Sequence, residues 1–240
     1  MPFKDGDFLE VDYSAWDAAT KELISTTDEK LAKDNELYNK DSAYGPTLVI
    51  LGSNSVIKGL DRELRGMSLN EMKKFTFTPE DAFGNRHEEL VRVMPLSDFR
   101  ARDMNPYPGM RVEVENMTAT VKSVNSGRVV VDANHPYAGR EITYEVRIVK
   151  NVTEPAQRVE ALGKTYNVKP SSVSVKDNEM VLSYDSKTRK NANYFVGKSS
   201  LVASILSLMK DIEKVEVVED YDRTEITKSG DPGTEEKKTG

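Results

Sequence analysis

Two short segments, separated by roughly fifty residues, constrain the fold of this chain more than any other feature. Thr78–Gly84 reads TPEDAFG and Asn134–Gly139 reads NHPYAG, and both contain the proline and glycine typical of turns. The residues between them have strands and turns of their own. We therefore predict one folded unit that is interrupted by another, with the two segments forming two sides of one site.

The residues outside the interruption predict an antiparallel sheet with one short helix against it. Residues Leu9–Tyr13 and Ile142–Ile148 alternate apolar and polar side chains, as expected for strands with one buried face. Further strands are predicted at Thr47–Leu51 and Lys74–Phe77, and apolar residues recur at helical spacing across Ile57–Leu64. The fold class is therefore α+β.

The residues between the two segments have the pattern of a small β-rich domain. Valine-rich strands are expected at Arg111–Val114, Ala119–Val124 and Arg128–Asp132, and Asn125-Ser126-Gly127 predicts a hairpin turn between the last two. Because both ends of an insertion must return to one loop, its two junctions should lie close together.

Beyond residue 153 the pattern predicts an α-β-β-α-β domain. We call residues 1–84 with 135–153 the split unit, residues 85–134 the insert and residues 154–222 the C-terminal unit. The charged residues 223–240 have the composition of a disordered tail.

Composition excludes several classes of function. A net charge of −6 provides no basic surface for a phosphate backbone, so we expect no nucleic-acid partner. There is no apolar run of the ~20 residues that span a bilayer, and the first ten residues do not resemble a signal peptide. We therefore expect a cytoplasmic protein without a membrane partner. With no cysteine and only His87 and His135, we expect no metal and no cofactor.

The polar candidates have ordinary explanations. Glu80 and Asp81 could act as an acid–base pair, but adjacent carboxylates that follow a proline are more typical of a solvated turn. His135 could act as a base, although its loop position favours a structural or rim contact. The pattern alone does not decide whether the apolar residues of the split unit form only a core or also a pocket.

Several motifs in order carry a specific resemblance. The segments VDY, TTDEKLAKD, YGP, VIKGLDRELRGM, TPEDAFG and NHPYAGREITYEVRIV resemble the FK506-binding-protein (FKBP) type of peptidyl-prolyl cis-trans isomerase. The resemblance covers residues 5–152. It is strongest to the archaeal long type related to the SlyD group, in which an insert-in-flap chaperone domain interrupts the flap. It implies an FKBP-type sheet for the split unit.

The resemblance also implies a proline-binding pocket. Tyr13 and Tyr144 match aromatic walls, Val56 and Ile57 match the pocket floor, and the remaining positions match its sides and flap. The implied catalytic set is Tyr13, Ile24, Val56, Ile57, Leu60, Phe83, His135, Ala138 and Tyr144.

Two positions depart from the family pattern. Ile24-Ser25 stands where most members have Phe-Asp, and Phe83 stands where most have tyrosine. The pocket therefore lacks an aromatic ring, a carboxylate and a hydroxyl, and we expect weakened catalysis and at best weak macrolide binding.

The insert carries apolar residues that have two explanations. They could form the core of a small domain, or, as the resemblance implies, they could bind unfolded chains, for which flexible methionines are suited. These residues are Val91, Val93, Met94, Leu96, Phe99, Met104, Tyr107 and Met110.

Three functional hypotheses follow. The first is a prolyl isomerase with chaperone activity, acting on unfolded or proline-containing polypeptides. The second is a holdase or peptide-binding module with a weakened or inactive isomerase pocket. The third assigns homodimerisation to the C-terminal unit through an apolar face of Val159, Leu162, Leu201, Ile205 and Met209.

Overall fold

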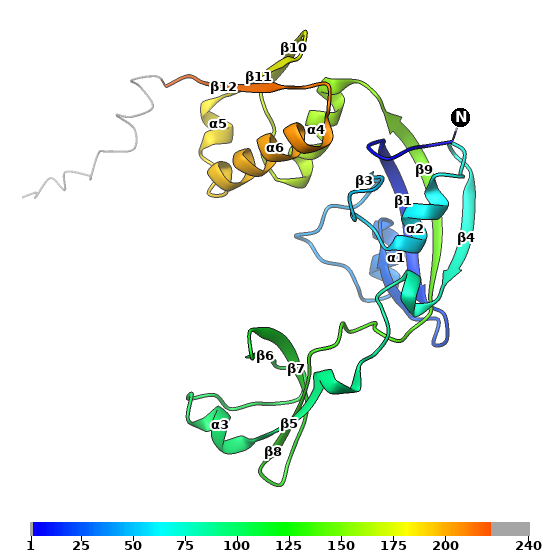
Figure 1. Ribbon diagram of the computed structural model, residues 1–240, viewed down its shortest axis with the longest axis vertical. Coiled ribbons are helices and arrows are strands. Elements are labelled where there is room, and N and C mark those ends of the chain that lie inside the picture. The colour runs from blue at the N-terminus through cyan, green and yellow to red at the C-terminus, as the bar shows by residue number, and fades with distance from the viewer. Residues whose placement is uncertain (1, 222–240) are drawn as a thin grey trace, which may run out of the picture.

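The computed structural model describes residues 2–221 and contains three separate β-sheets (Figure 1). A five-stranded sheet lies between a four-stranded sheet at one end of the molecule and a three-stranded sheet at the other. This arrangement, with short helices beside largely antiparallel sheets, confirms the α+β class. The predicted disordered tail, residues 223–240, lies outside the described residues.

The five-stranded sheet belongs to the split unit, and its strands are ordered β2-β1-β9-β4 with β3 also paired to β1. Strands β1 and β9 run antiparallel along their whole length, from the pair Phe8 and Val152 to the pair Asp17 and Ile142. The elements are β1 (Phe8–Asp17), β2 (Leu23–Thr26), α1 (Glu29–Asp34), β3 (Thr47–Ile50), α2 (Lys58–Leu64), β4 (Met72–Phe77) and β9 (Ile142–Val152).

The split unit has two helices rather than the single one predicted. The additional helix, α1, buries only Ala32, so it has no apolar stripe from which sequence periodicity could detect it. It is stabilised locally instead: the Asp28 carboxylate accepts a hydrogen bond from the Leu31 amide at 2.9 Å, and Lys33 pairs with Glu29 at 2.6 Å.

The insert is a four-stranded antiparallel sheet in the order β5-β8-β7-β6. The three predicted strands are present, and β5 and α3 are additional. Its elements, with the turn that precedes it, are η1 (Pro79–Asp81), η2 (Glu88–Leu90), β5 (Val91–Pro95), α3 (Leu96–Arg100), β6 (Arg111–Val114), β7 (Met117–Asn125) and β8 (Arg128–Asp132).

The C-terminal unit follows the predicted α-β-β-α-β order, with one extra turn of helix. Strands β10 and β11 are antiparallel, whereas β12 returns through α6 to lie parallel to β11. Its elements are α4 (Pro155–Thr165), β10 (Ser172–Lys176), β11 (Glu179–Tyr184), α5 (Ser186–Arg189), α6 (Tyr194–Leu208) and β12 (Lys214–Glu219). None of the helices within residues 2–221 has the length and apolarity needed to cross a bilayer.

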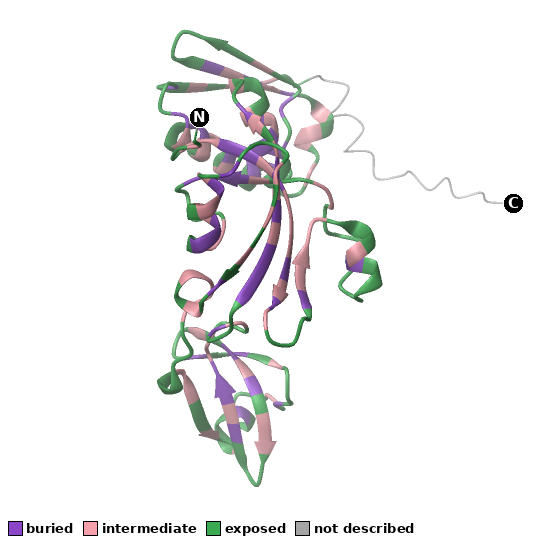
Figure 2. Cartoon of the chain, turned by 90° about the vertical axis from the view of Figure 1, so that its right-hand side faces the viewer, coloured by how far each residue is buried: buried purple, intermediate pink, exposed green. Residues whose placement is uncertain are grey.

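The hydrophobic cores show which units are joined. Buried residues run along the strands of the split unit (Figure 2), but side chains at its end belong to a second core. Phe8, Ile50 and Val152 are buried together with residues of α4, α6 and β11. The split unit and the C-terminal unit therefore share one hydrophobic core.

That shared core corrects the basis of the dimer hypothesis. The five residues expected to form an exposed apolar face are all buried inside the chain's own core: Val159, Leu162, Leu201, Ile205 and Met209. The amphipathic pattern was read correctly, but the apolar face packs against strands of the C-terminal unit itself and against the ends of β1, β3 and β9 of the split unit. These side chains cannot provide a surface for a second copy.

Candidate functional site

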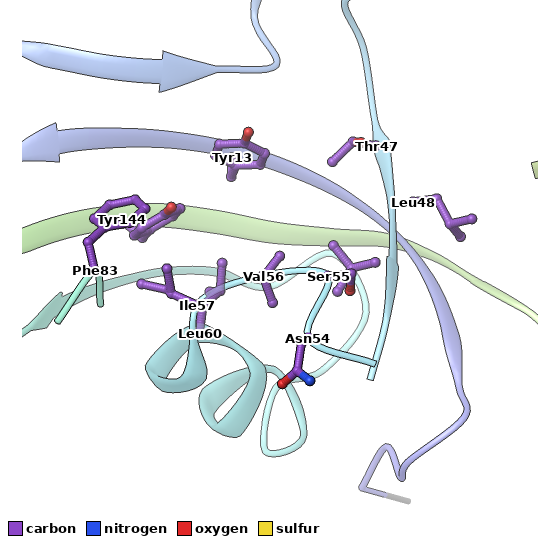
Figure 3. Close-up of a pocket in the computed structure, with 11 residues that line it drawn as sticks. Tyr13, Thr47, Leu48, Asn54, Ser55, Val56, Ile57, Leu60, Phe83 and Tyr144 are labelled. Carbon is purple, nitrogen blue, oxygen red and sulfur yellow. The ribbon is translucent and has the colours of Figure 1, made fainter. Parts of the chain in front are cut away.

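A cavity of about 430 Å³ lies between the five-stranded sheet and the start of α2 (Figure 3). Its wall combines side chains from β1, β3, β9, α2 and the segment before the insert. The lining residues are Tyr13, Thr47, Leu48, Val49, Asn54, Ser55, Val56, Ile57, Leu60, Phe83 and Tyr144. None of them is charged.

Two tyrosines from neighbouring strands form the sheet side of the cavity. Tyr13 of β1 and Tyr144 of β9 have ring centroids 5.7 Å apart, and the Tyr13 hydroxyl lies 3.1 Å from the Ser25 hydroxyl. Burial raises the pKa of Tyr144 well above its usual range, and the nearby Tyr13 raises it further, so its phenol stays neutral. The wall is thus aromatic and uncharged.

The opposite side is formed where the chain enters α2. Gly59 allows this helix to lie directly on β4, since a Cβ at that position would be 2.3 Å from Cδ1 of Phe77. This close packing places Ile57 and the buried Leu60 in the cavity wall. Ile57 is the N-cap residue, and nothing among residues 2–221 accepts a hydrogen bond from its backbone amide. A residue of the cavity wall therefore has a backbone amide without an intramolecular acceptor.

Phe83 closes one end of the cavity and links the two segments that flank the insert. Its ring stacks on His135, with centroids 4.5 Å apart and planes at 7°, and it also contacts Tyr137 at 5.5 Å. The Gly139 amide donates to the Gly84 carbonyl at 2.8 Å. The predicted meeting of TPEDAFG and NHPYAG in space is therefore confirmed.

The structure brings together six of the nine residues that the sequence assigned to the pocket: Tyr13, Val56, Ile57, Leu60, Phe83 and Tyr144. The other three do not line the cavity. Ile24 lines a neighbouring cavity of about 280 Å³, which also contains Tyr13. His135 supports Phe83 from behind, and Ala138 is buried in the turn in which its amide donates to the His135 carbonyl.

Sequence reasoning missed the polar end of the cavity. Thr47 and Leu48 of β3, with Asn54 and Ser55 of the following turn, lie at the end opposite Phe83 (Figure 3). The only signal was the Gly-Ser-Asn-Ser run before Val56, which marks a turn and says nothing about which surface the turn faces.

The two adjacent carboxylates hold the loop in place. Asp81 accepts two hydrogen bonds from Arg62, at 2.8 and 3.2 Å, and these hold the pKa of Asp81 below its usual value. Glu80 accepts a hydrogen bond from Asn85, and its pKa is also lowered, chiefly by a hydrogen bond from its own amide. Neither carboxylate lines the cavity, so this pair cannot act as its general acid and base.

A polar network fastens the base of the insert. Asp132, almost fully buried, accepts hydrogen bonds from Arg86 at 2.7 Å and from the Asn134 side chain at 2.8 Å. Burial raises the pKa of Asp132, but the hydrogen bonds from Asn134 and Arg86 outweigh burial and leave it lowered. Asn134 also bonds both backbone groups of His87. These contacts hold together the two chain segments that connect the insert to the split unit.

The eight apolar residues singled out in the insert divide between core and surface. Phe99 is buried, and Met94, Leu96, Met104 and Met110 pack against the same core. Val93 and Tyr107 are instead 62% and 63% exposed, and Val91 is partly exposed. Val93 lies on β5, an edge strand of the insert sheet.

Comparison with known proteins finds two family models that match different parts of the chain. Residues 2–98 match the family described as FKBP-type peptidyl-prolyl cis-trans isomerase, and residues 92–137 match the family FKBP26, IF domain. A short-type peptidyl-prolyl cis-trans isomerase of Methanocaldococcus jannaschii is 31% identical over 145 residues, which cover 60% of this chain and 91% of that protein.

Bacterial proteins are also similar. The FKBP-type isomerase SlyD of Vibrio cholerae is 31% identical over 121 residues, which cover 49% of this chain and 60% of SlyD. An FKBP-type 16 kDa isomerase of Escherichia coli is 24% identical over 110 residues, which cover 44% of this chain and 73% of that protein.

Proposed function

This chain belongs to the FKBP-type peptidyl-prolyl cis-trans isomerase family, and from that premise we propose that the 430 Å³ cavity is its isomerase site and that the insert holds unfolded substrate chains. The observation that carries the proposal is an uncharged, aromatic-walled cavity whose wall includes Ile57, a residue with an unbonded backbone amide. Such a site suits a substrate that reacts by rotation about a bond and needs no nucleophile.

The physics of the reaction explains why no charged residue is required. Rotation about an X-Pro bond has a barrier of ~18–20 kcal/mol because it breaks amide resonance. In the twisted transition state the carbonyl is less polar than in the planar amide, so an apolar, water-poor cavity favours the twisted form over the ground state.

Each side of the cavity then has a role. Tyr13, Leu60 and Tyr144 enclose the proline ring, and the free amide of Ile57 donates to a substrate carbonyl. Phe83 contacts the substrate beside the rotating bond but offers no hydroxyl. The proposed catalytic set is thus the six lining residues, with His135 as a positioning residue behind Phe83.

The decisive experiment is a proline-limited refolding assay. We expect the wild type to accelerate refolding and the double variant Tyr13→Ala, Phe83→Ala to lose most of that acceleration. Tyr38→Ala is the matched control, because it removes a half-exposed tyrosine that does not line the cavity. If the double variant is as active as the control, the assignment of the site is wrong.

The missing hydroxyl gives a second test. Phe83→Tyr adds one hydrogen-bond donor at the cavity wall. A typical hydrogen bond contributes ~1 kcal/mol, so we expect kcat/KM to rise about fivefold. An unchanged rate on a tetrapeptide substrate would show that position 83 does not reach the substrate carbonyl.

The proposed chaperone role rests on the exposed apolar side chains and the free edge of β5. An extended client strand could add to that edge while its side chains contact Val93 and Tyr107. We expect the double variant Val93→Ser, Tyr107→Ser to suppress client aggregation less than the wild type, with tetrapeptide activity unchanged. Val175→Ser, at an exposed valine of β10, is the control.

Deleting residues 86–133 should remove aggregation suppression completely and leave tetrapeptide isomerisation largely intact. Unchanged suppression would contradict the role of the insert. Suppression without any isomerase activity in the wild type would favour the alternative, a holdase with a decayed pocket.

Homodimerisation would need a surface other than the buried one expected from sequence. Phe195 and Val196 of α6 are exposed and apolar, and they are the candidates in the C-terminal unit. Light scattering of the full chain and of Phe195→Asp would test them: a monomer in both cases removes the dimer from the proposal.

A further inference from the structure

A second cavity, of about 330 Å³, lies against the polar end of the isomerase cavity. Residues 43–48 form one side, and Ala161, Lys164 and Thr165 of α4 form the other, with Glu10 of β1 completing the wall. Thr47 and Leu48 line both cavities. We call this second cavity the α4 cleft. The two cavities therefore adjoin each other at Thr47 and Leu48.

The position of the α4 cleft is fixed by packing. Leu48 packs against the shared core, in which Ile50 of the same strand is buried beside Val159 and Leu162 of α4. Alternation along β3 sends the neighbouring Val49 into the other core. The shared core thus holds the C-terminal unit at the edge of the isomerase cavity.

The charged side chains in the wall of the α4 cleft indicate which kind of ligand it favours. Lys164 is exposed and forms no ion pair among residues 2–221, and its neighbour Glu160 pairs with Lys169 instead. Glu10 on the other side also forms no ion pair among the described residues, since the ammonium of Lys150, its partner across the β1–β9 ladder, donates to Gln157. Glu10 is half-buried, however, whereas Lys164 is exposed. The exposed charge in the wall of the α4 cleft is therefore that of the Lys164 ammonium.

We infer that the C-terminal unit supplies a second substrate subsite, in which Lys164 binds an acidic side chain of the polypeptide whose proline occupies the isomerase cavity. This inference rests on the proposed function of that cavity. A bound chain leaves the proline pocket past Thr47 and enters the α4 cleft. Because extended chain advances ~3.3–3.6 Å per residue, the acidic residue lies within a few positions of the proline.

The test compares peptides that differ at one residue. Glutamate, alanine or lysine is placed at successive positions on either side of the proline, and affinity is measured by fluorescence anisotropy. At one position we expect glutamate to bind about threefold more tightly than alanine, the size of one exposed ion pair. Lys164→Glu should remove that preference and favour lysine instead.

Two further variants complete the test. Lys210→Glu changes the net charge equally at an exposed lysine that does not line the α4 cleft, and it should keep the preference for glutamate. Thr165→Trp places a large side chain in the cleft from an exposed position. It should lower the affinity for the glutamate peptide to that for the alanine peptide. If Lys164→Glu behaves like Lys210→Glu, or no position prefers glutamate, the inference is overturned.

A neutral tetrapeptide separates this inference from the proposed function, because it offers no charge to Lys164. If the wild type does not isomerise the tetrapeptide, the isomerase assignment itself is wrong. Normal tetrapeptide activity without any glutamate preference would remove only the α4 subsite.

Discussion

The insert and the C-terminal unit lie at opposite ends of the split unit's sheet and are joined to it by different interactions (Figure 1). The core of the insert contains only its own residues, and polar contacts around Asp132 hold its base. The C-terminal unit instead shares a hydrophobic core with Phe8, Ile50 and Val152. An attachment by hydrogen bonds at one connector leaves a unit free to fold separately, whereas a shared core makes two units fold as one.

This difference matches the roles we propose. A unit that captures many client sequences gains from independence, because it can reorient without disturbing the isomerase cavity. A unit that supplies one subsite of a groove must keep a fixed distance from that cavity, which the shared core provides.

The largest expected effect comes from one substitution made in each unit. Phe8→Ala and Phe99→Ala each remove a buried phenylalanine and should cost about 3–5 kcal/mol of local stability. Phe8→Ala should destabilise the split and C-terminal units together, so that they unfold in one transition. Tetrapeptide activity should fall at the denaturant concentration of that transition. Phe99→Ala should unfold only the insert. Denaturant unfolding of each variant, followed by circular dichroism and by tetrapeptide activity, measures these effects. If Phe99→Ala loses as much activity as Phe8→Ala, the insert does not fold independently.

The polar connector gives the next effect. Asp132→Asn removes a buried carboxylate bonded to Arg86 and should cost about 1.5–3 kcal/mol at pH 7, in the insert alone. Because the folded-state pKa of Asp132 lies below that of an unfolded aspartate, its contribution is complete above about pH 4 and falls as pH drops through the folded pKa.

The difference between wild type and Asp132→Asn should therefore shrink in acid. Hydrogen exchange of the insert at pH 7 and at acid pH measures this change. Asp98→Asn, at an exposed aspartate of α3 away from the connector, is the matched control, and a constant difference for Asp132→Asn would contradict the assignment of the connector.

The smallest effect concerns the contact between the connector and the cavity. His135→Ala removes the ring stacked on Phe83, a pair worth about 0.5–1.5 kcal/mol, and should lower kcat/KM on a tetrapeptide by up to about tenfold. His87→Ala is the matched control, since its ring is exposed and contacts Glu89. Equal rates for the two variants would mean that Phe83 is held in place without His135.

The sequence predicted the strongly periodic elements well. Strands β1 and β9 and helix α2 each bury one regular face, so alternation or helical spacing revealed them. Helix α1 was missed because capping and one ion pair hold it without a buried stripe. Six pocket residues could be named because motifs before and after the insert carry them, whereas Thr47, Asn54 and Ser55 lie in ordinary strand and turn sequence.

By itself, the sequence determined the family, the interruption of one unit by another and six of the residues that line the cavity. These depend on local patterns and on the kinds of residue present. Only the tertiary structure decided what the apolar face of α4 and α6 covers, because periodicity shows that a face is buried and cannot show against what. The same packing against Phe8, Leu48 and Ile50 places Lys164 in a cleft that adjoins the 430 Å³ cavity.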